Sequence, residues 1–342
     1  MHHTPTAIEF PTTTPASSAA RLTRTASTRS PSAAFRSIAD PPYLPPTQTT
    51  ADLLLPLFPR HPNPDLDPSC LPAEATTALP SSPLRSAHIH DPTERHTTVS
   101  AWRRHLRRFP CGAPDGTGLR DSYLLACPNS LTLAALWLQA LLSSRTTPAH
   151  RRLLASKTLG GKVKPDKHTR QLPPTAAQAT AARPLARHPV TRRLIAGFLS
   201  RRLTPILRPV YSRLWQLGLL PAGIEIAPRR HQLHRDLSTQ PIADAALDVQ
   251  NAHTSASRLS CYLTAASHAH QLADPIVHRF RLYILSYYHF PTATYIQVGA
   301  SYHLYWQTDG LDQGEALASH AFGLCLGTAI ATSLAPSVPS LI

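Results

Sequence analysis

Residues 245–253 read Ala-Ala-Leu-Asp-Val-Gln-Asn-Ala-His, and the rest of the chain is organised around this stretch. A short apolar run ends on Asp248, and small polar residues follow that are suited to opening a helix. The order predicts a buried strand over 242–249, with the Asp248 carboxylate at its exposed end, and then a helix over 251–266 capped by Asn251. Such a carboxylate is well placed to hold a metal ion; the structural alternative is a helix-capping acid.

The chain is basic, with 34 Lys and Arg residues against 19 Asp and Glu residues among 342. This excess favours a polyanionic partner such as nucleic acid, and an anionic membrane is the weaker alternative. Every lysine lies between Lys157 and Lys167, so arginine supplies most of the charge. GC-rich coding is therefore an alternative origin of the arginine content.

The five cysteines are far apart and include no CxxC pair, which argues against a disulfide framework or a zinc knuckle. The first residues lack the apolar segment of a secretory signal peptide, so we expect a nuclear or cytoplasmic protein that is not secreted. The uncharged run 321–342 is interrupted by Pro336 and Pro339. Its apolar part is shorter than the roughly 20 residues of a spanning helix, which favours a buried helix and no membrane.

Composition divides the chain into four parts. Residues 1–85 are rich in Pro, Ser and Thr and predict a disordered tail with one short helical turn near 53–58. Residues 86–111 form a basic linker, residues 112–334 a folded region, and residues 335–342 a second tail. His88, His90 and His96 have no supporting carboxylate or thiol, so chance explains their spacing better than a metal site.

The linker contains a basic segment, 101–109, with aromatic residues at both ends. It could stack on bases and contact phosphates, or it could be a solvated helix face anchored by Trp102, Leu106 and Phe109.

Hydrophobic periodicity and turn residues predict further elements. These are helices over 131–142, 274–288 and 316–334, one or two helices over 194–220 broken at Pro205 and Pro209, a loop over 234–240, and strands over 292–298 and 302–307 joined by a turn at 299–301.

Several short blocks then occur in a fixed order. They are Gly-Thr-Gly-Leu-Arg at 116–120, Leu-Leu-Ala-Ser at 153–156 with Lys-Pro-Asp-Lys at 164–167, Arg-Pro-Leu-Ala at 183–186 with Arg-Arg-Leu-Ile at 192–195, Gln-Leu-Gly at 216–218 with Pro-Ala-Gly-Ile-Glu at 221–225, and Gln-Gly-Glu-Ala-Leu at 313–317. Together with Leu-Asp-Val-Gln-Asn-Ala at 247–252, this series resembles the reverse transcriptase domain of a non-LTR retrotransposon.

The resemblance implies an α+β fold, namely the helix-rich fingers and partial palm of a right-hand polymerase behind a disordered N-terminal region. The implied activity is RNA-directed DNA synthesis on an RNA template and a DNA primer with Mg²⁺. It assigns Asp248 as the catalytic metal ligand, and Arg183, Lys164 and Lys167 as cations facing the triphosphate. It also places His253, where the family has Phe, beneath the incoming sugar, Gln313 beside the nucleotide, and Gly314 where the backbone approaches closely.

The sequence departs from the family where two more carboxylates should follow. No adjacent Asp-Asp pair occurs among the 342 residues. Since nucleotidyl transfer needs carboxylates to hold two metal ions, we expect a truncated protein that is inactive as this chain. The alternatives are a noncatalytic nucleic-acid-binding remnant and a degenerate open reading frame. The sequence leaves the oligomeric state open.

Overall fold

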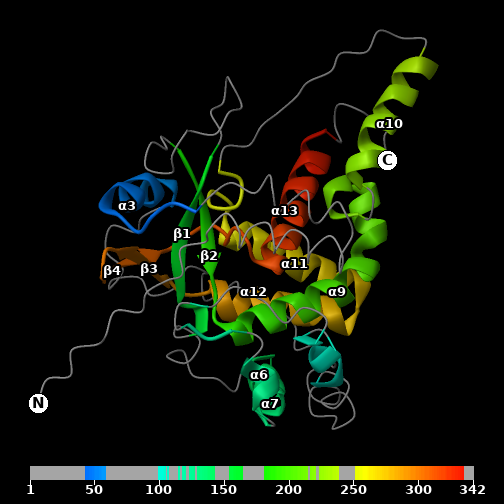
Figure 1. The fold of residues 1–342 in the computed structure, drawn as a ribbon. Helices are drawn as coiled ribbons and strands as arrows, with labels where there is room; N and C mark the ends of the chain where they lie inside the picture. The colour runs from blue at the N-terminus through cyan, green and yellow to red at the C-terminus, as the bar shows by residue number, and fades with distance from the viewer. Residues whose placement is uncertain are drawn as a thin grey trace, which may run out of the picture.

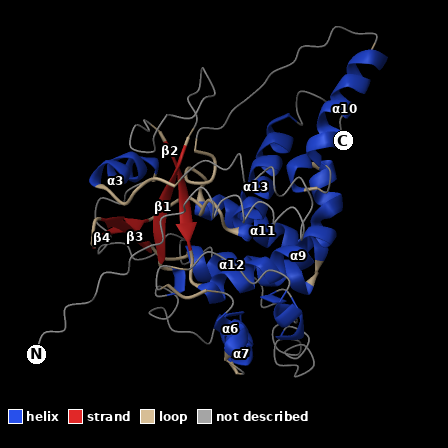
Figure 2. Cartoon of the chain, in the orientation of Figure 1, coloured by secondary structure: helices blue, strands red, loops and turns tan. Residues whose placement is uncertain are grey.

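The chain forms a mixed α+β structure, which confirms the expected class. Figures 1 and 2 show a sheet and α3 on one side and a body of helices on the other. The computed structural model describes residues 43–58, 99–104, 106–107, 115, 118–120, 123–127, 129–142, 154–164, 181–214, 216–220, 223–238 and 251–334.

The sheet has four strands in the order β2-β1-β3-β4. They are β1 (Lys157–Val163), β2 (Ala182–Arg187), β3 (Thr292–Val298) and β4 (Ser301–Gln307). β1 pairs antiparallel with β2 and parallel with β3, and β3 and β4 form the predicted hairpin around Gly299, whose φ is +60°. β1 and β2 were not foreseen, because glycines in β1 and a proline in β2 lower their strand propensity.

One face of the sheet is covered by the N-terminal helix α3 (Gln48–Leu54) and the 3-10 turn η1 (Leu55–Leu57). Their apolar side chains join those of the strands in a small core made of Leu44, Ala51, Leu54, Phe58, Leu159, Val163, Ala182 and Ile296. The prediction of disorder through residue 85 is therefore wrong for 43–58. The few apolar residues of 43–58 cannot form a hydrophobic core by themselves. They are buried because they pack against apolar side chains of the sheet.

A larger core lies among the helices α7 (Ser130–Leu142), α9 (Val190–Arg213), α11 (Arg258–Leu272), α12 (Pro275–Tyr288) and α13 (Ala316–Leu334). The short helix α6 (Tyr123–Ala126) adds Leu124. The helical segment 99–104 adds Trp102, which meets Phe198 edge-on at 6.0 Å between ring centroids. Trp102 and Leu106 are buried while Arg103 and Arg104 are exposed, as expected for a solvated helix anchored by its apolar residues.

Three helices match the sequence prediction closely. α7 and α13 lie where the periodicity placed them, and α12 begins after Asp274, whose Oδ1 accepts the N–H of Ile276 at 2.7 Å. An aspartate N-cap followed by proline is a strong local start signal, which explains why this boundary could be predicted.

Among the described residues, one helix, α13, is long and apolar enough to cross a membrane by length and composition. Its first half is instead buried in the larger core through Leu317, Ala318, Ala321 and Leu324. The buried helix that the sequence predicts is therefore found in the first part of α13, while residues 329–333 are exposed.

The predicted break at Pro205 and Pro209 does not occur, because α9 runs continuously through both. The two prolines are one helical turn apart and exposed, so water can reach the carbonyls that they leave without an N–H partner. Buried Leu203 and Leu207 keep the opposite side of the helix packed.

Two further boundaries differ from prediction. The expected loop at 234–240 begins with the last turn of α10 (Gly223–Leu237), which follows the 3-10 turn η4 (Leu217–Leu219). The helix expected from residue 251 starts instead at Arg258, where the Ser257 hydroxyl accepts the N–H of Ser260. Asn251 does not cap a helix, since its φ is +52° and it opens a run of turns. The predicted strand 242–249 lies outside the described residues.

We expect the α9–α13 contact to weaken in acid because of His320. Its Nδ1 lies 2.5 Å from the Tyr211 hydroxyl oxygen, and its Nε2 lies 2.9 Å from Ser200 Oγ. Burial lowers the pKa of His320 from 6.5 to about 4. The unfolded chain therefore takes up the proton first, and stability falls as the pH drops from 6.5 towards 4, by up to roughly 3 kcal/mol.

Denaturant unfolding across that pH range should give a flatter stability curve for His320→Gln than for the wild type. His303→Gln, at an exposed position on β4, is the matched control and should keep the wild-type slope. Equal slopes for all three proteins would contradict the assignment.

Candidate functional site

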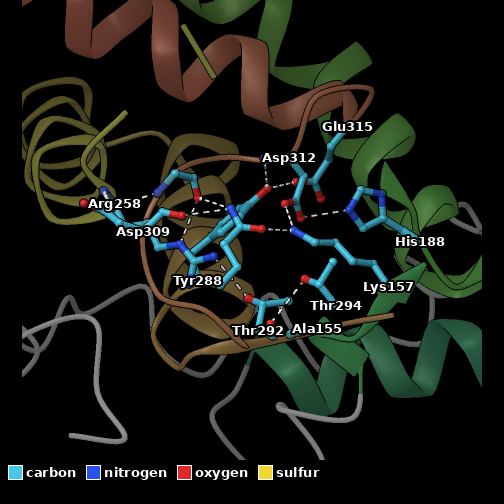
Figure 3. A network of polar contacts seen from close by, with 12 residues as sticks. Ala155, Lys157, His188, Arg258, Tyr288, Thr292, Thr294, Asp309, Asp312 and Glu315 are labelled. Atoms are coloured by element: carbon cyan, nitrogen blue, oxygen red, sulfur yellow. Dashed lines mark hydrogen bonds and ion pairs between the residues drawn. The ribbon is translucent and has the colours of Figure 1, made fainter. Parts of the chain in front are cut away.

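A cluster of buried charges lies where the sheet meets the helices. It contains Lys157 from β1, His188 from the connection after β2, Arg192 from α9, and Asp312 and Glu315 from the segment between β4 and α13. Figure 3 shows Lys157, His188 and Asp312 converging on one point, with Glu315 beside them. The chain separations are large, so this group exists only in the folded state.

Arg192 is the centre of the cluster and has no exposed surface. Its Nε and Nη2 donate to the two Glu315 oxygens at 2.9 and 3.0 Å, and Nη2 also donates to Asp312 Oδ2 at 3.0 Å. Its Nη1 donates to the Ala155 carbonyl at 3.0 Å. The guanidinium also lies over the Tyr287 ring, 4.6 Å from the centroid. This fork-like pairing satisfies a buried guanidinium with strong, charge-assisted bonds.

The two carboxylates are saturated by donors. Asp312 accepts from the Lys157 ammonium, from Arg192 and from His188 Nε2, the last at 2.9 Å. Glu315 accepts from Arg192 and from the hydroxyls of two α12 tyrosines, Tyr283 and Tyr288. Each carboxylate therefore has the several hydrogen bonds that a buried anion requires.

The charges balance at neutral pH. Burial lowers the pKa of Lys157 to about 8, so it remains a cation at pH 7, and burial lowers the pKa of His188, so the imidazole is neutral. Burial alone would raise the pKa of Asp312 and of Glu315, but Lys157 holds the first, and Arg192 the second, below its usual range. Two cations thus face two anions.

His188, Asp312 and Glu315 place one potential ligand atom each within 4.8 Å of one another, which raises the question of a metal ion. The carboxylate oxygens are already engaged by Arg192, Lys157 and the tyrosines, and the summed charge is already zero. A divalent cation would have to displace one of these donors. The donor set therefore fits a structural ion cluster and does not fit a resident metal.

A second arginine fixes the segment before Asp312. The backbone N–H of Arg258 donates to Asp309 Oδ1 at 2.7 Å. Its guanidinium donates to the carbonyls of Gly310 and Phe290 at 2.9 and 3.1 Å, and to Thr292 Oγ1 at 3.2 Å. Figure 3 shows Arg258 beside Asp309 and Thr292. Arg258 thereby ties the start of α11 to β3 and to the loop that leads into Gln313.

The fold brings together three of the blocks that carry the resemblance. The Ala186 N–H on the free edge of β2 donates to the Gln313 carbonyl at 3.2 Å. The Leu311 N–H donates to the His253 carbonyl at 2.7 Å. The His253 ring stacks on Phe322 of α13, with 5.3 Å between centroids. Backbone hydrogen bonds therefore join the loop 311–313 to β2 at Ala186 and to the turns at His253, although these segments are far apart in sequence.

The individual predicted residues have different surroundings. Arg183 is exposed on β2, and Lys164 directly follows β1, where its N–H donates to the Ala181 carbonyl at 3.1 Å. Gly314 is exposed with a φ of +99°, and a Cβ there would lie 3.8 Å from the Ala186 oxygen. The positive φ therefore explains why a glycine occupies position 314, since a side chain there would meet no close contact within the protein. Asp248 and Lys167 lie outside the described residues.

His253 lies in the turns that follow residue 251, and its ring already has partners within the protein. It is half-buried, its Nε2 lies 3.4 Å from Ser319 Oγ, and burial lowers its pKa. Its contact with a nucleotide sugar stays a prediction.

Sequence reasoning missed most of the ion cluster. Arg192 and Glu315 belong to two of the blocks that carry the resemblance. No local pattern in the sequence, however, predicts an ion pair between residues 123 positions apart. The sequence contains no local signal for burial either, because Lys157 and Arg192 each have polar or charged residues on both sides in the chain.

No protein family matches the sequence, and no curated protein does so either.

Glu315→Gln should destabilise the protein by about 3 kcal/mol, because it leaves the buried Arg192 with one unbalanced positive charge. Urea unfolding at pH 7 measures the change. Asp236→Asn, on the exposed face of α10, removes the same charge and should cost little. If the Glu315→Gln protein is as stable as the Asp236→Asn protein, the ion cluster is not required for stability. If millimolar Mg²⁺ stabilises the wild type, the conclusion that the cluster holds no metal ion is wrong.

Gly310→Ala should also be strongly destabilising. Gly310 has a φ of +80°, and a Cβ would lie 2.1 Å from the Thr254 carbonyl oxygen, so the 251–256 turns would have to separate from the loop. Gly299→Ala is the matched control, with a φ of +60° and open space around it. We expect about 1 kcal/mol for Gly299→Ala and about 3 kcal/mol for Gly310→Ala by urea unfolding. Equal losses would contradict the close approach.

Proposed function

We propose that this chain is a reverse-transcriptase-like protein of the non-LTR retrotransposon type. It binds an RNA template with a DNA primer, and these 342 residues do not extend the primer by themselves. On this proposal the sheet and the helices after it correspond to fingers and part of a palm, and the ancestral activity is RNA-directed DNA synthesis.

The observation that supports the proposal is the meeting of the three blocks. β2 carries Arg183, the turns after residue 251 carry His253, and the loop before α13 carries Gln313 and Gly314, and backbone hydrogen bonds join all three. An incoming nucleotide needs a cation for its phosphates, a planar group near its sugar and polar groups near its base. Residues of these kinds lie on segments that these backbone hydrogen bonds join, in the order that the resemblance requires.

Arg183 is the residue best suited to a phosphate. It is exposed on β2, and its Cα partner across the strand pair is Lys162, so two cations share one face of the hairpin. An arginine guanidinium can bind a phosphate in a bidentate manner, and the exposure of Arg183 leaves it accessible to one.

The proposed lack of extension rests on the carboxylates. Asp248 is the one acid at a position that the resemblance assigns to Mg²⁺, and no Asp-Asp pair occurs in the sequence. The buried cluster offers no substitute, since its carboxylates are saturated by Arg192, Lys157 and tyrosines. We therefore derive no chemical step through a metal ion.

A fluorescent RNA-template and DNA-primer duplex tests the proposal directly. We expect binding that weakens steeply with salt, with a slope near −0.9 per phosphate contact, and no extended primer with Mg²⁺ and all four deoxynucleotides. A template-dependent product would overturn the lack of extension. Absence of salt-dependent binding would overturn the proposed function and favour a degenerate open reading frame.

Arg183→Ala tests the assigned residue. It should weaken duplex binding and reduce the salt slope by about 1, because one phosphate contact is lost. Arg208→Ala, which removes an exposed arginine from α9, is the matched control and should leave the slope unchanged.

A further inference from the structure

The face of the sheet opposite α3 is partly exposed: Arg187, Tyr295 and Leu304 are exposed, Thr158 is half-buried and Ala293 is buried. Side chains at directly paired positions point to the same face, and the strand register places Arg187, Thr158, Tyr295 and Leu304 in one row across all four strands. The row spans about 14 Å at about 4.8 Å per strand. We call this surface the outer face.

Aromatic side chains are accessible on the outer face. Tyr295 of β3 is 37% exposed, and Tyr302, which pairs with Gln297 and so points to the same face, is 52% exposed. Strand positions that face a protein interior would be covered. These tyrosines instead present ring surface to solvent.

Cations lie beside a third exposed tyrosine at the β1–β2 end of the same face. The Lys162 ammonium is 4.9 Å, and the Arg187 guanidinium 5.4 Å, from the centroid of the Tyr43 ring. Gly160 makes room for this arrangement, because a Cβ there would lie 3.3 Å from Arg187 Nη2. The Arg187 guanidinium thus lies over Gly160 and beside the Tyr43 ring.

The charge of the sheet is of one sign. None of the four strands contains Asp or Glu, while β1 and β2 contribute Lys162, Arg183 and Arg187 to the outer face. Such a surface is complementary to a polyanion.

We propose that the outer face binds a single strand of nucleic acid, with Lys162 and Arg187 on its phosphates and Tyr295 and Tyr302 stacking on its bases. This inference rests on the proposed function, and it adds a strand-binding track beyond the residues assigned to the nucleotide. A group of exposed rings on β3 and β4 beside cations on β1 and β2 suits a strand whose bases are unpaired. A duplex hides its base faces, and an acidic peptide offers no planar groups to the tyrosines.

Fluorescence anisotropy with uridine and thymidine oligomers of roughly 20 nucleotides measures this binding on the full chain. Lys162→Ala with Arg187→Ala should weaken it at least about tenfold and make the salt slope shallower by about 1.4, the value for two phosphates of a single strand. Tyr295→Val with Tyr302→Val should weaken it about tenfold with little change of slope. Valine keeps the strand propensity.

Arg208→Ala with Arg213→Ala is the charge-matched control on the exposed side of α9, and we expect no more than about a twofold effect. Circular dichroism and thermal unfolding must show that each variant folds as the wild type does; a misfolded pair is replaced by Lys162→Gln with Arg187→Gln. If the wild type binds oligomers but the sheet variants match the control, the inference is overturned and the proposed function stands. If polyglutamate competes as well as the oligomers do, the ligand class is wrong. If neither an oligomer nor a template-primer duplex binds, both proposals fail.

Discussion

The structure depends on the neutralisation of one buried guanidinium. Arg192 has no contact with solvent, so its charge must be matched inside the protein, and Asp312 and Glu315 supply the matching oxygens. Those two acids sit on the segment between the hairpin and α13. The ion pairs of Arg192 on α9 therefore fix the position of that segment. The ion pair between Lys157 and Asp312 connects the same segment to β1.

The ion cluster and Arg258 position three residues to which the resemblance assigns a role, namely Gln313, Gly314 and His253. Gln313 and Gly314 stand between Asp312 and Glu315, so the two buried acids hold both ends of the short stretch that meets β2. Arg258 fixes the preceding loop and, through it, the turns that carry His253. The proposed nucleotide site thus lies beside a structural ion cluster. The charges of Arg192, Asp312 and Glu315 are buried and stabilise the fold, whereas that of Arg183 is exposed and accessible to a ligand.

Sequence reasoning succeeded where the signal was local and failed where the partner was distant. The Asp274 cap, the glycine turn of the β3–β4 hairpin and the apolar period of α13 each lie within a few residues of the element they define. The N-terminal helix and the unbroken course of α9 do not, because their apolar residues are stabilised by segments that are distant in the sequence. The same limit applies to the ion cluster.

By itself the sequence determined the mixed α+β class, the helices and hairpin with strong local signals, and the order of the blocks that suggests a polymerase. Only the tertiary structure decided that 43–58 joins the fold, that β1 and β2 form a sheet with an exposed basic face, and that Arg192 pairs with Asp312 and Glu315. The reason is physical: caps, turns and periodicity act between neighbours along the chain, whereas burial selects partners in space and makes an unpaired charge costly only after folding has removed the water.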